Sequence, residues 1–197
     1  MSLSYRIARA ILRPSLRLLW RMRVEGRENV PASGPLIVAC NHVSYMDPPA
    51  LGTACPRPIS YMAKKELFDI PFLGAAIRSF GAYPVDRRGS SAAIKRSVEV
   101  LRSGGCIGIF PEGTRNVRGD AEVHIGVAVL ASLARAPVVP VAIVGSDRAV
   151  RLGAIKVVFG EVMHLPQDRK ATRAELSKFT QDVMNAIGSL AGRARGN

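Results

Sequence analysis

This chain of 197 residues has little cysteine, few aromatic residues and no long uninterrupted apolar stretch. Its three cysteines, Cys40, Cys55 and Cys106, lie far apart, without a C-x-x-C pair or a histidine at zinc-ligand spacing. We therefore predict reduced, mostly buried thiols in a cytosolic setting, and no metal site. No window reaches the about 18 consecutive apolar residues of a membrane-spanning helix. No apolar segment precedes a small-residue cleavage site, so we expect no signal peptide.

Acidic residues are also scarce. Lysine and arginine total 28 against 15 aspartates and glutamates, which gives a formal net charge of +13. Such a charge attracts polyanions, so nucleic acid, anionic lipid and phosphorylated small molecules are candidate partners. Aromatic residues make up only 6% of the chain, and it has no aromatic-rich strand motif, zinc-ligand set or basic zipper region. These absences argue against nucleic acid as the partner.

Near the N-terminus, arginines recur every three or four residues, with no acidic residue between Arg6 and Arg23. At about 100° per residue this spacing places them on one face of a helix, with most apolar side chains on the other and Trp20 near the boundary. The pattern is typical of a helix lying in a membrane interface. The alternative is an ordinary amphipathic helix packed on its own domain. Pro14 predicts a break into two short helices.

We predict this amphipathic arm over residues 1–25 and one α/β domain over residues 26–197. Short apolar runs predict buried strands at residues 36–39, 59–62, 82–85, 106–110, 138–144 and 155–159. Helical spacing covers residues 65–80, interrupted at Pro71, and residues 90–102, 126–135 and 171–190. The last helix opens with a capping box, Thr172 and Glu175. This alternation predicts a mainly parallel, mixed sheet flanked by helices, with its active site where strands end.

His42 and Asp47 follow the first predicted strand, within Asn41-His42-Val43-Ser44-Tyr45-Met46-Asp47. Their spacing would separate them on a regular helix, so the pair fits a strand-end loop that leads into a helix. There the carboxylate could accept a hydrogen bond from one imidazole nitrogen, leaving the other as general base for a substrate hydroxyl. No serine or cysteine of the protein need then be acylated. Taken alone, the pair is equally consistent with an unrelated loop histidine and N-cap aspartate.

Two further strand ends carry groups suited to a phosphate. Glu112-Gly113-Thr114-Arg115 combines a glycine that allows close backbone approach, a hydroxyl, and a guanidinium that can donate two parallel hydrogen bonds. Arg87, after the run at residues 82–85, could converge with Arg115 on one anion. The alternatives are a β-turn with a surface arginine and a solvated charged turn. Glu112 fits a simple turn badly, because an acidic residue beside a phosphate site should have its own task.

Together these motifs resemble those of the glycerolipid acyltransferase family, which includes 1-acylglycerol-3-phosphate acyltransferases. The resemblance covers about residues 31–146. It rests on residues 41–47, Val85-Asp86-Arg87, residues 110–115 and Val139-Pro140-Val141, in that order. The resemblance implies that His42 deprotonates the acceptor hydroxyl while Asp47 holds the ring. It also implies that the acceptor's phosphate is held by Arg87, Glu112, Gly113, Thr114 and Arg115.

The activity implied is transfer of a fatty acyl chain from acyl-CoA or acyl carrier protein (acyl-ACP) to the free hydroxyl of 1-acylglycerol-3-phosphate or a similar lysophospholipid. No bound cofactor is expected beyond this acyl thioester co-substrate. Expected partners are the lysophospholipid acceptor, an anionic bilayer and, for an acyl-ACP donor, the carrier protein. We expect peripheral attachment to the cytoplasmic face of the cell membrane.

Three alternatives stay open: a thioesterase or lipid hydrolase that uses water, a transferase for another acceptor, and a non-enzymatic basic protein. One departure from the family pattern bears on the acceptor site. Val123-His124-Ile125-Gly126 stands where family members often carry a lysine-containing Phe-Lys-x-Gly segment. His124 would replace that lysine's contact only in part.

Overall fold

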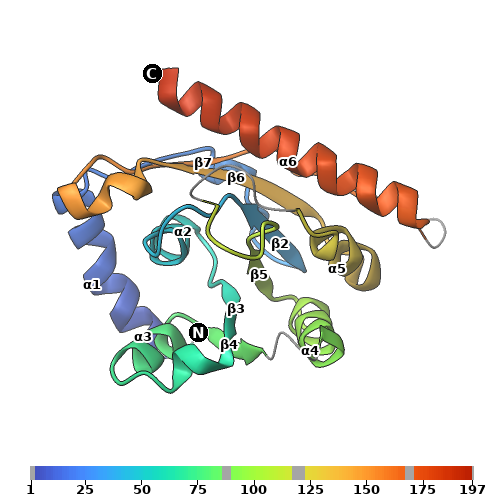
Figure 1. Ribbon diagram of the computed structural model, residues 1–197, viewed down its shortest axis with the longest axis horizontal. Helices are drawn as coiled ribbons and strands as arrows, with labels where there is room; N and C mark the ends of the chain where they lie inside the picture. Colours follow the sequence, from blue (N-terminus) through green and yellow to red (C-terminus); the bar gives the residue numbers. More distant parts are fainter. Residues whose placement is uncertain (1–2, 86–89, 117–122, 167–170, 197) are drawn as a thin grey trace.

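A seven-stranded sheet, in the order β1-β7-β6-β2-β5-β3-β4, forms the centre of the computed structural model, which describes residues 3–85, 90–116, 123–166 and 171–196 (Figure 1). The strands are β1 (Arg23–Glu25), β2 (Leu36–Cys40), β3 (Ser60–Lys64), β4 (Ala82–Val85), β5 (Cys106–Ile109), β6 (Val138–Val144) and β7 (Lys156–Phe159). Neighbouring strands are parallel except β6 and β7, which are antiparallel. The predicted mainly parallel, mixed sheet is confirmed.

Helices flank both faces of this sheet. They are α1 (Leu3–Leu19), α2 (Asp47–Ala54), α3 (Leu73–Ser79), α4 (Ser90–Arg102), α5 (Gly126–Ala134) and α6 (Arg173–Gly196), with short 3-10 helices η1 (Arg27–Asn29), η2 (Lys65–Phe68) and η3 (Ser146–Arg151). The predicted interruption near Pro71 separates η2 from α3. The capping box is also confirmed, since the Thr172 N–H donates to Glu175 Oε2 at 2.7 Å and the Glu175 N–H donates to Thr172 Oγ1 at 3.3 Å.

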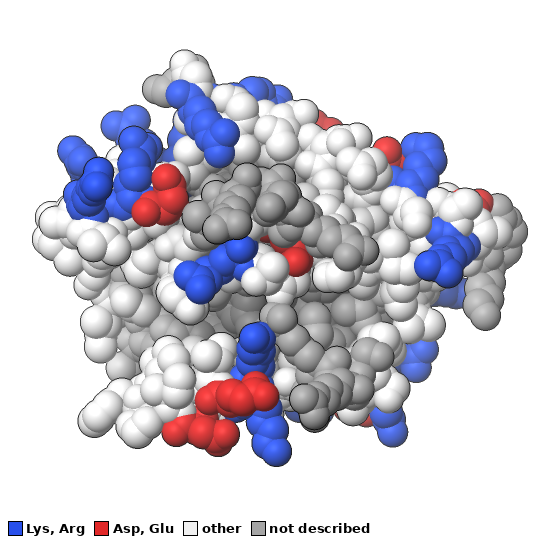
Figure 2. Space-filling view, in the orientation of Figure 1, with Lys and Arg blue, Asp and Glu red and all other residues white. Residues whose placement is uncertain are grey.

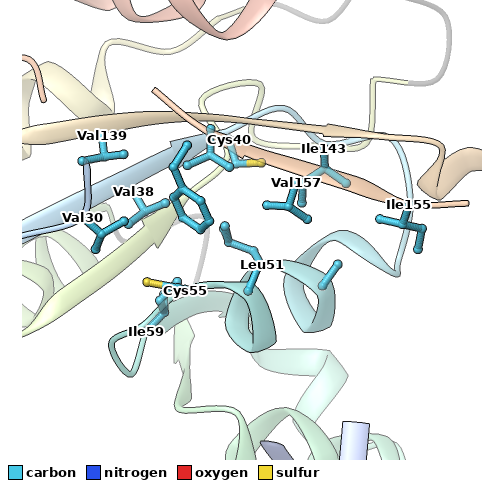
Figure 3. Packing of buried hydrophobic residues seen from close by; sticks show 14 of the residues in the cluster. Val30, Val38, Cys40, Leu51, Cys55, Ile59, Val139, Ile143, Ile155 and Val157 are labelled. Atoms are coloured by element: carbon cyan, nitrogen blue, oxygen red, sulfur yellow. The ribbon is translucent and has the colours of Figure 1, made fainter. Parts of the chain in front are cut away.

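Side chains of the central strands alternate between two apolar cores. On β2, Val38 and Cys40 lie in the core beneath α1 and α2, whereas Ile37 and Ala39 face the core formed with α4, α5 and α6. Figure 3 shows Val38 and Cys40 on the sheet above Leu51 of α2. All three cysteines are buried and free, as predicted. Burial on both faces explains why β2 is apolar at every position.

The N-terminal helix α1 is continuous, so the break predicted at Pro14 is wrong. Both Pro14 and Ala10, whose carbonyl loses its helical partner there, lie on the exposed side of α1, where water can satisfy that carbonyl. Tyr5 and Leu16 are buried. The helix therefore packs on the domain along one side despite its proline.

Residues after α1 join the sheet. The short strand β1, which was not predicted, pairs in parallel with β7. Trp20, expected at a lipid boundary, is instead half-buried, and its Nε1–H donates to the carbonyl of Ala149 at 2.7 Å. Within the described ranges no helix is long and apolar enough to cross a membrane.

Candidate active site

The loop between β2 and α2 brings His42 and Asp47 into contact, as their spacing predicted. The Nδ1 atom of His42 lies 2.9 Å from Oδ2 of Asp47. The same oxygen accepts hydrogen bonds from the backbone N–H groups of Val43 and Ser44, each at 2.7 Å. The Asp47 side chain is 0% exposed, whereas 16% of the His42 side chain is accessible. The imidazole is therefore held at Nδ1 by the buried carboxylate, and the rest of the ring is partly open to solvent.

Local sequence explains why Asp47 takes this position. Asp47 is the first residue of α2, where the helix dipole stabilises a carboxylate. Pro48 and Pro49 follow and lack N–H groups, so Asp47 uses the amides of the preceding loop instead. We assign the shared proton to Nδ1 of His42, because an ionised carboxylate can only accept. The second ring nitrogen then carries the basic lone pair.

Glu112, predicted at the phosphate site, lies beneath the His42 loop. It is 6% exposed. Its Oε2 accepts the backbone N–H of His42 at 2.8 Å, and its Oε1 accepts the side-chain amide of Asn116 at 3.1 Å. The backbone N–H of Asn116 in turn donates to the carbonyl of His42 at 2.6 Å. Glu112 thus joins the loops that follow β2 and β5, which is the separate task that the sequence suggested for it.

Two further sets of contacts hold His42 and the strand end that precedes it. The ring of Phe110, directly after β5, stacks on the His42 ring with centroids 4.3 Å apart. The Asn41 side chain exchanges two hydrogen bonds with the backbone of Ile143 on β6, at 2.8 and 2.9 Å. The end of β2 is therefore fastened to both neighbouring strands, β5 and β6, beside the proposed base.

The turn after β5 places the remaining predicted groups at the surface. Gly113, Thr114 and Arg115 are exposed, and Gly113 has φ +63°, a left-handed conformation that favours glycine. A Cβ at Gly113 would lie only 3.0 Å from the ring of His124. The Arg115 guanidinium lies over the ring of Tyr45, with its carbon 3.8 Å from the centroid. Residues of the β2 and β5 loops thus form one surface at the site.

Arg87, the other predicted phosphate ligand, lies outside the described residues. The strand that leads to it, β4, runs parallel to β3 and ends at Val85, at the same edge of the sheet as the ends of β2 and β5. In the view of Figure 1 the loops after β2 and β5 lie near the middle, and Figure 2 shows a hollow there with Lys and Arg atoms at its rim.

Sequence reasoning missed several groups at the site. Asn41 and Phe110 adjoin predicted residues, so their place in the motifs was the available signal. Tyr45 also lies within the motif at residues 41–47, but neither its contact with Arg115 nor the contacts of Asn116 left a signal, because they depend on how the two loops meet. A cleft of about 620 Å³ between β7 and α6, lined among others by Phe159, contains none of the predicted site residues.

A family model and several named proteins match this chain. A family model described as Acyltransferase matches residues 21–144. A Bacillus subtilis protein named 1-acyl-sn-glycerol-3-phosphate acyltransferase is 34% identical over 94% of this chain and 100% of its own length. A protein of the same name from Borreliella burgdorferi is 38% identical over 61% of this chain and 50% of its own length.

A solved structure shares the fold. The 1-acyl-sn-glycerophosphate (LPA) acyltransferase PlsC from Thermotoga maritima superposes with a TM-score of 0.79 at 24% identity, over 98% of this chain and 80% of that one. At 24% identity, this comparison shows a shared fold alone, in the arrangement of the sheet and its helices.

Replacing Glu112 tests whether its carboxylate supports the His42 loop. Glu112→Ala leaves the partly buried N–H of His42 without its acceptor, so we expect the free energy of unfolding to fall by about 1–3 kcal/mol. Urea denaturation measures this change. Glu112→Gln keeps an acceptor oxygen and should lose less. The exposed Glu161 provides a control, because Glu161→Ala should stay within about 0.5 kcal/mol of the parent. Equal stability of Glu112→Ala and Glu161→Ala would contradict the role of Glu112.

Proposed function

This chain belongs to the acyltransferase family, and we propose that it transfers a fatty acyl chain from an acyl thioester to the free hydroxyl of 1-acylglycerol-3-phosphate. One observation carries the proposal. The Asn116 N–H to His42 carbonyl bond joins the loop of the His42–Asp47 pair to the turn with Gly113 and Arg115. A general base and a phosphate-suited turn therefore adjoin. The names of the relatives supply the acceptor.

The proposed reaction is direct transfer. The free ring nitrogen of His42 takes the proton from the acceptor hydroxyl, and the resulting alkoxide oxygen attacks the thioester carbonyl carbon. The tetrahedral intermediate collapses, the C–S bond breaks, and the leaving thiolate takes the proton back from the imidazolium. The buried carboxylate of Asp47 stabilises the positive charge that His42 gains meanwhile.

The surroundings of His42 also bear on whether the protein itself is acylated. Its nearest thiol in sequence, Cys40, is 0% exposed. Burial raises the pKa of the Cys40 thiol well above its usual value, and the charges of Asp47 and Glu112 raise it further. Cys40 is therefore a neutral thiol at pH 7, because a thiolate needs a lowered pKa. Within the described ranges the ring of His42 has no hydroxyl or thiol as hydrogen-bond partner, which favours the substrate hydroxyl as nucleophile.

Arg115 is suited to the acceptor's phosphate. Stacking on Tyr45 occupies the flat face of the guanidinium and leaves its N–H edge free to donate two hydrogen bonds to an oxyanion. Thr114 offers a hydroxyl beside it. The nearby His124 supplies a ring donor that replaces the contact of the family's lysine only in part, and Arg87 completes the predicted set. In this proposal Glu112 positions the loop and does not touch the phosphate.

We place the enzyme peripherally on the cytoplasmic face of the membrane, where the acyl chain of the acceptor resides. The exposed arginines Arg6 and Arg17 of α1 support contact with anionic lipid. The proposed donor is acyl-CoA or acyl-ACP, without a bound cofactor. Assays of the purified protein with each donor in turn, on vesicles that contain 1-acylglycerol-3-phosphate, distinguish the two.

His42→Ala tests the general base. We expect kcat for acyl transfer to fall by about two to four orders of magnitude, because the acceptor hydroxyl loses its proton acceptor. Transfer of labelled palmitate to 1-acylglycerol-3-phosphate measures the loss. His164 gives a matched control, since it is exposed and follows Met163, which pairs with Val138 at the opposite end of β6 from the site.

Two results would count against the transferase. Full activity in His42→Ala would remove the base from the mechanism. Consumption of the thioester by the parent protein at the same rate with and without acceptor would indicate a hydrolase.

Tyr45 and Arg115 test phosphate recognition. Tyr45→Ala should raise the KM for the acceptor about two- to fivefold with little change in kcat, because stacking of an exposed cation is modest. Tyr45→Phe keeps the ring and should behave like the parent. Arg115→Lys should raise the KM further, since an ammonium lacks the planar pair of donors. An unchanged KM in Arg115→Lys would exclude this contact.

A further inference from the structure

Exposed large apolar side chains gather on three segments of the fold. Of eleven such side chains among the described residues, four are on α1, three lie where η2 leads into α3, and two lie at the end of η3. These nine are Ile7, Ile11, Leu18, Leu19, Ile70, Phe72, Leu73, Val150 and Leu152. Exposure reaches 98% at Val150, 91% at Phe72 and 81% at Leu18. Apolar exposure of this extent in one region marks an interaction surface.

The other two segments each adjoin α1, one at either end. The C-terminal end of α1 is fastened to η3, because Trp20 Nε1–H donates to the Ala149 carbonyl at 2.7 Å. The other end of α1 contacts the end of α3, where the rings of Tyr5 and Phe80 meet edge to face at 6.2 Å. In Figure 1, α3, α1 and the orange η3 follow one another along the left side of the molecule. We call these three exposed apolar groups together the docking surface.

The helix α1 has two apolar faces. At about 100° per residue, the buried Tyr5 and Leu16 lie on one side, and the exposed Ile7, Ile11 and Leu18 lie together on the opposite side. The sequence prediction of one apolar face is therefore incomplete. One face packs on the domain, and the outer face has no covering element within the described residues.

Positive charge lies beside two of the three segments, α1 and η3, whereas the segment at η2 also carries the exposed acidic residues Glu66 and Asp69. Arg6 and Arg17 lie together along one side of the outer face of α1, and Arg148 and Arg151 belong to η3, all four exposed. A cleft of about 460 Å³ beside η3 is lined by five cationic residues. They are Arg21, Arg23, Arg148, Lys156 and Arg195. Figure 2 shows Lys and Arg atoms gathered at the upper left of this face, with mostly uncharged atoms below them.

We infer that the docking surface binds an anionic bilayer through all three segments, and not through α1 alone. Apolar side chains enter the acyl boundary while the arginines beside them meet lipid phosphates. The inference deepens the proposed function and rests on it, because an acceptor held in a bilayer gives the surface its purpose. The charge argues for lipid over a second copy of the chain, whose equal positive field would repel it.

Topology connects this surface to the reaction. The η3 segment follows β6, and His42 follows β2, which is the parallel neighbour of β6. The η3 segment and His42 therefore both lie at the carboxyl-terminal ends of the parallel strands. A bilayer that contacts η3 and α1 thus lies on the side where the site opens.

Backbone conformation singles out two of the exposed side chains. Phe72 has φ +62° and Leu152 has φ +52°, values that bulky residues rarely adopt. Such strain persists only where the surrounding structure holds it, and here it presents apolar groups to solvent.

Flotation of the full chain with lipid vesicles tests the three-segment surface. The probes are vesicles of phosphatidylcholine with phosphatidylglycerol, and vesicles of phosphatidylcholine alone. Phe72→Asn, and separately Val150→Ser with Leu152→Asn, should each weaken binding to the anionic vesicles about tenfold or more. Asparagine suits the left-handed conformation of residue 152, which has φ +52° and ψ +33°. Arg148→Gln and Arg151→Gln should each weaken it about fivefold, and only where phosphatidylglycerol is present.

Leu133→Ser is the matched control, because Leu133 is 47% exposed but lies on α5, away from the docking surface. It should bind like the parent, and circular dichroism verifies that every variant is folded. His42→Ala should also bind vesicles normally, so failure of the proposed acyl transfer would leave this test intact.

Parent-like binding by both the Phe72 and the Val150–Leu152 variants would overturn the inference and leave α1 as the contact. A dimer of the parent protein in lipid-free sedimentation, lost in these variants while vesicle binding persists, would show that the surface joins two copies instead.

Discussion

The buried carboxylate of Asp47 is the constraint on which the site depends. Three donors converge on its Oδ2 atom: Nδ1 of His42 and the amides of Val43 and Ser44. The two amides hold the loop that carries His42, so one oxygen fixes both the backbone path and the ring. An ionised group that accepts several hydrogen bonds in a buried place can be displaced only at high cost. The base is therefore oriented before any substrate arrives.

Sheet order brings the second loop to this base. β2 and β5 are parallel neighbours with Ala39 opposite Ile109, so the chain leaves both strands at the same level. Residues about seventy positions apart then meet as His42 and Glu112. A slip of one residue would turn every side chain on the strand to the opposite core. The apolar side chains of the two cores thus determine the register that assembles the polar site.

Much of this arrangement could be predicted from sequence. Continuous apolar runs located six of the seven strands, and the strand-end rule placed the His42 and Arg115 loops together. β1 was missed because Arg23-Val24-Glu25 has no apolar pattern and joins the sheet only by pairing with β7. The support from Glu112 was unpredictable in detail, since its partner is a backbone N–H, which any residue could supply. Pairwise contacts such as Arg115 with Tyr45 depend on loop geometry and leave no spacing to detect.

The position of α1 links the surface of the molecule to its chemistry. Tyr5 donates from its hydroxyl to the carbonyl of Gly52 at 3.3 Å, and Arg9 donates to the carbonyl of Cys55. Both acceptors lie at the end of α2, whose first residue is Asp47. Gly52 lies within α2 and Cys55 directly after it, so less than the length of this eight-residue helix separates these contacts from the carboxylate that holds His42. A short helix transmits position rigidly, because its backbone hydrogen bonds fix its length. Wherever α1 rests on a lipid surface, the depth of His42 relative to that surface is then set by the fold and not by diffusion of a flexible arm.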